Sequence, residues 1–158
     1  MREWTTFSGL TFLVGPMRPL SSFMLGLTLG ACNGDPGVPS VIRVGGTYQT
    51  AVSVIASDCV GQTVEQHPTT VAHVPGATAL TLTHAGNSYS GTLDADGSFR
   101  TAPVSQVFDG VSYQIGITGR FSTTAIDAEV HVAAARQPPC SFTARWVGPK
   151  DGAPNTLP

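Results

Sequence analysis

The side chains best suited to chemistry in this chain are three cysteines, Cys32, Cys59 and Cys140. A thiolate can act as a nucleophile or bind a metal, and two cysteines can form a disulfide. An odd number of cysteines in an exported chain leaves one thiol that needs a role of its own. Cys32 alone follows a short apolar segment, and this context separates it from the other two.

The histidines do not form the pattern of a metal site. A zinc site needs three or four ligands that converge, often at short spacing along the chain. A proline lies between His67 and His73 and is expected to interrupt any strand there. His131 shares the polar face of a predicted strand with Asp127 and Glu129. A solvated strand face is the simpler interpretation, a surface metal site or pH-sensitive patch is the alternative, and we predict no metal and no cofactor.

Other catalytic patterns are equally weak. Residues 94–98, DADGS, begin like a calcium loop but lack its later ligands, so a hairpin turn is the better interpretation. Residues 86–91, GNSYSG, do not match the G-x-S-x-G sequence of a nucleophile elbow. Acidic residues are too scattered to suggest a pair of catalytic carboxylates. We therefore predict that the protein is not an enzyme.

Residues 17–32, MRPLSSFMLGLTLGAC, have the layout of a secretory signal. An arginine near the start precedes an apolar core from Phe23 to Leu29, and small residues follow. The core is too short to cross a bilayer as a helix, which needs about 20 apolar residues. Residues 1–16 fit poorly in front of this signal. Either the positive region is unusually long or translation begins at Met17, and we favour the internal start.

The end of this segment resembles the lipobox of bacterial lipoproteins, in which a leucine and two small residues precede a cysteine. The matching residues are Leu29, Gly30, Ala31 and Cys32. The resemblance implies cleavage before Cys32, lipidation of Cys32 and anchoring of the mature N-terminus in a membrane of the cell envelope. Asn33 follows the cysteine, which in this family favours the outer over the inner membrane of a Gram-negative cell. The alternative is an ordinary signal peptide cut near Ala31.

Behind the predicted signal peptide, residues 1–31, the sequence divides into a linker, one domain and a tail. Residues 32–43 and 149–158 are rich in Gly, Pro and Asp, and we predict that both are flexible. Apolar and polar residues alternate between them, over residues 44–148. The clearest example is residues 125–134, AIDAEVHVAA. A period of two is typical of a strand with one face in the core and one in solvent.

Similar alternation predicts strands along the whole domain. Turn sequences rich in Gly, Asn and Asp separate them, and no segment has the periodicity of an amphipathic helix. We predict an all-β domain: a single antiparallel up-and-down β-barrel, calycin-like, of about seven or eight strands, with a two-sheet β-sandwich as the alternative. The predicted strands cover residues 47–57, 78–84, 88–94, 98–107, 111–119, 125–134 and 140–148.

The two remaining cysteines flank this predicted barrel. Cys59 follows the first strand and Cys140 opens the last. The end of one strand lies beside the start of its antiparallel neighbour, so a disulfide would join the first and last strands, as a closed barrel requires. Lipidation of Cys32 leaves these two thiols as a pair, and an exported protein meets an oxidising environment. We therefore predict a disulfide between Cys59 and Cys140.

The composition excludes a nucleic-acid partner. The formal net charge is −2 and only 11% of residues are charged, so there is no basic surface for phosphates. Large rings on the inner face of a small barrel usually fill it, whereas in a wider barrel they line a ligand cavity. The residues predicted to line such a cavity are Tyr113, Phe142 and Trp146.

The segments GTYQTAVSV, GRF and CSFTARW, with the Asp96–Gly97 turn, resemble the small β-barrel domains of many uncharacterised bacterial lipoproteins. This resemblance is one of spacing and carries no active residues. We expect a lipid-anchored, non-catalytic module of the cell envelope that binds an unknown envelope protein. The alternative is a calycin-like carrier that holds a small apolar ligand inside the barrel.

Overall fold

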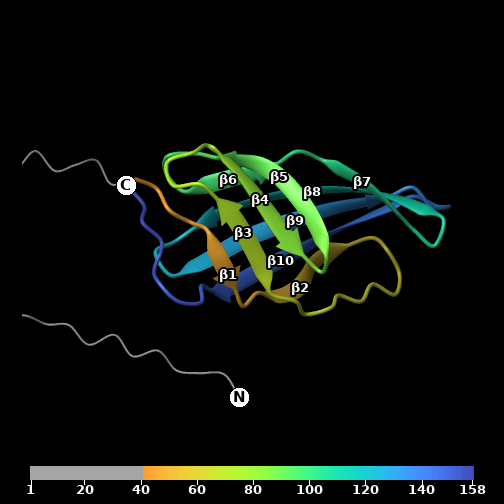
Figure 1. The fold of residues 1–158 in the computed structure, drawn as a ribbon. Coiled ribbons are helices and arrows are strands. Elements are labelled where there is room, and N and C mark those ends of the chain that lie inside the picture. The colour runs from red at the N-terminus through yellow and green to blue at the C-terminus, as the bar shows by residue number, and fades with distance from the viewer. Residues whose placement is uncertain (1–40) are drawn as a thin grey trace, which may run out of the picture. The chain divides into compact units, whose positions relative to one another are not determined.

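The structure is a computed structural model that describes residues 41–158, and within this range it contains β-strands and no α-helix (Figure 1). The predicted all-β antiparallel class is therefore confirmed. No helix in this range is long and apolar enough to cross a membrane. The predicted signal residues Leu29, Gly30 and Ala31, and the predicted lipidation site Cys32, lie outside the described residues. The strands are β1 (Gly46–Tyr48), β2 (Ala51–Ser57), β3 (Thr69–His73), β4 (Ala79–His84), β5 (Asn87–Leu93), β6 (Ser98–Thr101), β7 (Val104–Phe108), β8 (Val111–Phe121), β9 (Ala125–Ala134) and β10 (Cys140–Pro149).

All ten strands belong to one antiparallel sheet, with the order β1-β3-β4-β5-β6-β8-β9-β10-β2 and with β7 paired to β8. The sheet curls, and its two ends meet at a bend in the chain. Only Gln49 and Thr50 separate β1 from β2, yet β1 pairs with β3 and β2 pairs with β10. Tyr48 also forms a backbone bridge to Lys150 beyond β10. The up-and-down barrel is thus the better description, and the two-sheet sandwich is not formed.

The bend between β1 and β2 depends on a close approach of two backbones. Gly148 of β10 lies directly against Gln49 and Thr50, where a Cβ atom on Gly148 would overlap their backbone atoms. Glycine alone permits this contact, because every other residue carries a Cβ. The first strand can therefore cross from one neighbour to the other without leaving the sheet.

Two predicted strands are interrupted and one strand was not predicted. The structure divides the predicted strand 47–57 into β1 and β2, and the predicted strand 98–107 into β6 and β7. In the second case the break falls at Ala102 and Pro103, where proline cannot donate to a ladder. β3 begins directly after Pro68, although we expected this proline to prevent a strand between His67 and His73.

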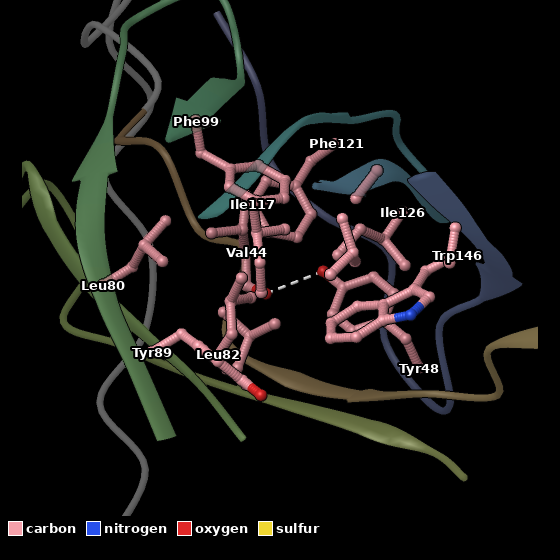
Figure 2. Packing of buried hydrophobic residues seen from close by; sticks show 14 of the residues in the cluster. Val44, Tyr48, Leu80, Leu82, Tyr89, Phe99, Ile117, Phe121, Ile126 and Trp146 are labelled. Carbon is pink, nitrogen blue, oxygen red and sulfur yellow. Dashed lines mark hydrogen bonds between the residues drawn. The ribbon is translucent and has the colours of Figure 1, made fainter. Parts of the chain in front are cut away.

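The interior of the barrel is filled by side chains from every part of the sheet (Figure 2). Phe121 lies at its centre, with its ring centroid 5.5 Å from that of Tyr48 and 4.9 Å from that of Phe99. Along β9, buried residues alternate strictly with exposed ones from Ile126 to Ala134, as its sequence predicted. Burial of these apolar side chains is the main force that holds the curled sheet together.

The predicted flexible tail, residues 149–158, is instead part of the barrel. Asn155 is buried, its Oδ1 lies 2.8 Å from the Tyr48 hydroxyl, and its Nδ2 donates to the Ser122 carbonyl. The backbone of Thr156 pairs with that of Arg43, so ordered structure also begins within the predicted linker, residues 32–43. The prediction failed because a polar, glycine-rich segment can still satisfy buried hydrogen-bonding groups.

The barrel has two distinct ends. The terminal end carries residue 41, the C-terminus and the turns that follow β5 and β8 (Figure 1). The distal end carries the β7–β8 turn at Asp109 and Gly110, the β9–β10 loop and Cys59. The strand register places this turn and this loop at the same end. Tyr113 of β8, near the turn, pairs with Ala134 at the end of β9, and Ala134 pairs with Cys140 at the start of β10. Any segment that precedes residue 41 therefore joins the domain at the end opposite the β7–β8 turn.

Candidate binding surface at the distal end

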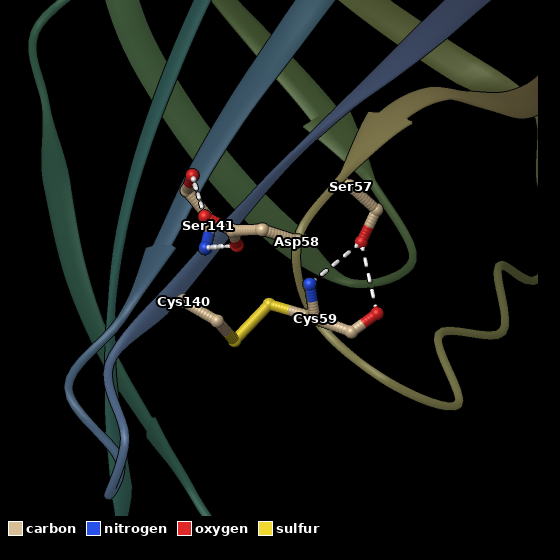
Figure 3. The surroundings of a disulfide bond; sticks show 5 residues. All are labelled: Ser57, Asp58, Cys59, Cys140 and Ser141. Carbon is tan, nitrogen blue, oxygen red and sulfur yellow. Dashed lines mark hydrogen bonds between the residues drawn. A yellow bond between two sulfur atoms is a disulfide. The ribbon is translucent and has the colours of Figure 1, made fainter.

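Cys59 and Cys140 join β2 to β10 at the distal end (Figure 3). Their Sγ atoms lie 2.00 Å apart, at bonding distance, and their Cα atoms are 5.2 Å apart. The carboxylate of Asp58 accepts a hydrogen bond from the Ser141 backbone N–H. Within residues 41–158, only Asp58, Cys59 and Cys140 bring three potential metal ligands together, and the two sulfur atoms are bonded to each other. This cluster is structural rather than a metal centre.

Strand β7 is paired on one side only. It forms a hairpin with β8 through a two-residue turn, in which Asp109 and Gly110 have φ angles of 48° and 76°. Such a turn makes Phe108 and Val111 a hydrogen-bonded pair, and hydrogen-bonded pairs then recur at every second residue. The N–H and C=O groups of Ser105 and Val107 consequently point away from β8, toward an edge that no other strand covers.

The exposed side chains on this edge are apolar. Val107 is 69% exposed and Phe108 is 50% exposed. No charged residue occurs from Thr101 to Phe108, although edge strands are normally protected by lysine, another charge or a bulge. Val60, which is 87% exposed, lies in the loop after β2. The distal end therefore presents a neutral strand edge together with apolar side chains.

A side-chain bridge, rather than a backbone ladder, connects β7 to β5. The Nε2 atom of Gln106 donates to Asn87 Oδ1 over 3.2 Å. Burial raises the pKa of the Tyr89 hydroxyl on β5. β6 pairs with β5 only from Gly91 onward, so β5 and β7 diverge toward the distal end (Figure 1). The edge of β7 stays open because of this divergence.

A second cluster, His84 with Trp146, Tyr89 and Thr69, fills the barrel interior near the β4–β5 turn. The Nδ1 atom of His84 lies 2.9 Å from Thr69 Oγ1, and its ring stacks on Trp146. Burial lowers the pKa of His84 to about 4, and its electrostatic interaction with nearby His67 contributes in the same direction. His84 is therefore neutral at pH 7. The Thr69 hydroxyl that contacts this imidazole is fully buried and also lies 2.9 Å from Thr50 Oγ1, so it belongs to the packed interior.

The three residues predicted to line a cavity all face the interior. Trp146 is 4% exposed, and its indole contacts the rings of His84 and Tyr89. Tyr113 and Phe142 are half-buried and pack against the core. The Tyr113 ring also meets the Phe108 ring, with their centroids 5.8 Å apart. Neighbouring side chains thus occupy the space around these rings.

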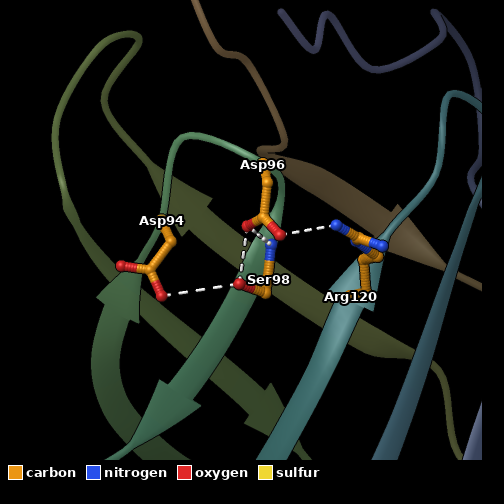
Figure 4. A network of polar contacts seen from close by, with 4 residues as sticks. All are labelled: Asp94, Asp96, Ser98 and Arg120. Atoms are coloured by element: carbon orange, nitrogen blue, oxygen red, sulfur yellow. Dashed lines mark hydrogen bonds and ion pairs between the residues drawn. The ribbon is translucent and has the colours of Figure 1, made fainter.

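Two arginine–carboxylate ion pairs lie on the outer face of the sheet. Arg145 binds Asp127 with both Nε and Nη2, and Arg120 binds Asp96 in the β5–β6 turn (Figure 4). In that turn Asp96 also accepts hydrogen bonds from Ser98, so its carboxylate is already occupied. A depression of about 380 Å³ runs between these ion pairs. Both arginines that line it are paired with carboxylates, and Glu129 adds a further negative charge, so the depression does not favour an anion.

The histidines do not converge. His131 lies on the outer face, 3.8 Å from Glu129, and its Nδ1 contacts Thr143 Oγ1. His67 and His84 meet edge to face near the β2–β3 junction, with ring centroids 5.9 Å apart. Neither arrangement brings two histidines together with Asp127 or Glu129.

Comparison with known proteins returned no match among family models, curated proteins or solved structures. The interpretation of this chain thus depends on its own residues. Sequence reasoning did not identify the edge of β7, because residues 98–107 read as one continuous strand. Pro103 was the available signal, since proline is expected at a strand end or on an edge.

Proposed function

We propose that this protein is a lipid-anchored extracytoplasmic lipoprotein whose barrel is a non-catalytic binding module of the cell envelope. One observation carries the binding role. The uncovered edge of β7, with Val107 and Phe108 exposed, lies at the end of the barrel opposite residue 41. An apolar, uncharged strand edge is suited to pairing with another chain.

The predicted lipid anchor and the β7 edge would lie at opposite ends of the domain. Lipidation of Cys32 would attach the mature chain to a membrane, and residues 33–40 would form the tether. The described domain continues from residue 41 at its terminal end, so the distal end would face away from the membrane. A binding surface placed there is accessible to other proteins.

The packing supports a binding surface rather than an internal carrier site. Ligand pockets are usually concave spaces of several hundred Å³. In this barrel, the rings of His84 and Tyr89 fill the interior around Trp146, and the rings of Phe121 and Tyr48 fill its centre. A carrier would have to displace these side chains, whereas the edge of β7 needs no rearrangement to bind.

Two measurements in the exporting host test this proposal. A clickable fatty acid should label the wild-type protein and not Cys32→Ser, and labelling of that variant would contradict the lipid anchor. A photo-crosslinking residue at Val107 should capture a protein, whereas the same residue at Thr118, exposed on the outer face of β8, should not. Equal capture at both positions, or none at Val107, would contradict the binding role of the distal end.

A further inference from the structure

We propose that the partner of β7 is a second copy of this chain, which pairs antiparallel through its own β7 with the two Gln106 residues opposite each other on a two-fold axis. The inference rests on the proposed function, because it names the partner of the same edge.

The backbone groups allow this register. Ser105 and Val107 are the two residues of β7 whose N–H and C=O groups point away from β8. With Gln106 on the axis, Ser105 of one copy lies opposite Val107 of the other, and each such pair exchanges two hydrogen bonds. The axis produces the pair twice, so four backbone hydrogen bonds would close the uncovered edge.

The side chains are compatible with the same register. Val104 would lie opposite Phe108 of the second copy, which places apolar groups together on the inner face of the joined sheet. On the outer face, Val107 would lie beside Ser105. Asp109 would face Pro103, beyond the paired segment, so two-fold symmetry brings no like charges together. Association would cover Val107 and Phe108, the exposed apolar residues of this strand.

The other free edge of the sheet is less suitable. The side-chain amide of Gln66 already occupies the backbone of Val52 on β2, where it both accepts from the N–H and donates to the carbonyl. In β7, no side chain of the described residues hydrogen-bonds to the outward N–H and C=O groups of Ser105 or Val107, and Gln106 bonds Asn87 through its side chain only. A second copy of the chain is a neutral partner that supplies the same β-forming sequence.

Oligomeric state is the first test. The full chain carrying Cys32→Ser, which removes the predicted lipid and the third thiol, should form dimers in analytical ultracentrifugation at about 100 µM, a range suited to a small interface. Val107→Lys should weaken dimerisation at least about tenfold, because it places a charge on the paired edge. The matched control is Val74→Lys, which makes the same change at a valine that is 71% exposed in the turn after β3 and should leave dimerisation unchanged.

The register is tested by crosslinking between two different variants. Ser105→Cys and Val107→Cys proteins, mixed and treated with a short bis-maleimide, should give a crosslinked heterodimer. Each variant alone should give much less, because identical positions are offset across the axis. Crosslinking of Val107→Cys alone at the same efficiency as the mixture would overturn the register.

A chain that stays monomeric at about 100 µM would overturn the inference. So would a dimer that Val107→Lys does not weaken, since another surface would then form the contact. In either case, capture of a different envelope protein at Val107 would still support the proposed function. If that capture is also absent, both proposals are wrong.

Discussion

The imidazole of His84 stacks on the indole of Trp146, with ring centroids 4.1 Å apart and planes inclined by 20°. The two residues lie on β4 and β10, far apart in the sequence, and the stack contributes to the packed interior of the barrel. An imidazole in this position is stable in its neutral form. Charging it would place a desolvated cation beside Trp146 and close to His67.

We expect the protein to lose stability as the pH falls from about 6.5 to about 4. Burial lowers the pKa of His84 to about 4 in the folded state, whereas an exposed histidine has a pKa near 6.5. The unfolded chain therefore takes up the proton first, and this stabilising contribution is complete above pH 6.5 and decreases through pH 4. Urea unfolding at pH 7 and pH 4.5 should show a loss of about 2 kcal/mol from this group.

The control for this prediction is His131→Gln, which changes an exposed histidine on the outer face. His84→Gln should reduce the difference between the two pH values, whereas His131→Gln should leave it unchanged. An equal pH dependence in wild type and His84→Gln would contradict the assignment to His84.

Gln66→Ala should destabilise the junction between β2 and β3. The Gln66 amide accepts from the Val52 N–H over 2.7 Å and donates to the Val52 carbonyl over 2.8 Å. It thus replaces a missing neighbouring strand, and its removal leaves both backbone groups without a partner, at a cost of about 1–3 kcal/mol. Urea unfolding measures this loss, and the exchange rate of the Val52 amide should rise.

Gln62→Ala is the matched control in the same loop, and its effect on both measurements should be small. A Val52 amide that exchanges equally slowly in wild type and Gln66→Ala would show that another group protects it.

Tyr48→Phe should also destabilise the protein. The Tyr48 hydroxyl is buried within hydrogen-bond distance of the Val44 carbonyl, at 2.7 Å (Figure 2), and of Asn155 Oδ1, at 2.8 Å. The hydroxyl has one proton to donate, so its loss leaves one more buried acceptor unsatisfied inside the barrel, which costs about 1–3 kcal/mol. Thermal or urea unfolding checks this, with Tyr113→Phe as the control because Tyr113 is only half-buried. Equal losses in the two variants would contradict the role of the buried bonds.

Local patterns predicted the strands that have one wet and one dry face. Residues 125–134 form β9 with the predicted bounds, because their alternation continues over ten residues. β3 was missed because its five residues, between two prolines, contain few apolar groups. Its inward residues include Thr69, which a hydrophobic pattern does not mark as buried although it is. Short strands that depend on tertiary hydrogen bonds give a weak sequence signal.

Long-range relationships were predictable only where chemistry restricts the partners. Two cysteines that flank the first and last strands have few alternatives, and the structure places Cys59 and Cys140 at bonding distance. The His84–Trp146 stack was not predictable, nor was the pairing of the Gln66 side chain with the Val52 backbone, since histidine and glutamine have many potential partners. The bend at Gln49 could not be predicted from the sequence for a similar reason. It depends on Gly148, nearly a hundred positions away, which allows the backbones to approach.

The disulfide should contribute a large part of the stability. It connects positions separated by 81 residues, and a crosslink over such a distance restricts the unfolded chain strongly. Replacing both Cys59 and Cys140 by serine should lower the free energy of unfolding by about 2–5 kcal/mol. Because β2 has a neighbouring strand only on the β10 side, hydrogen exchange should accelerate most at Ser57 and neighbouring β2 amides. Cys32→Ser should change neither measurement, and equal unfolding free energies with and without the bond would show that the β2–β10 ladder alone keeps this end of the barrel closed.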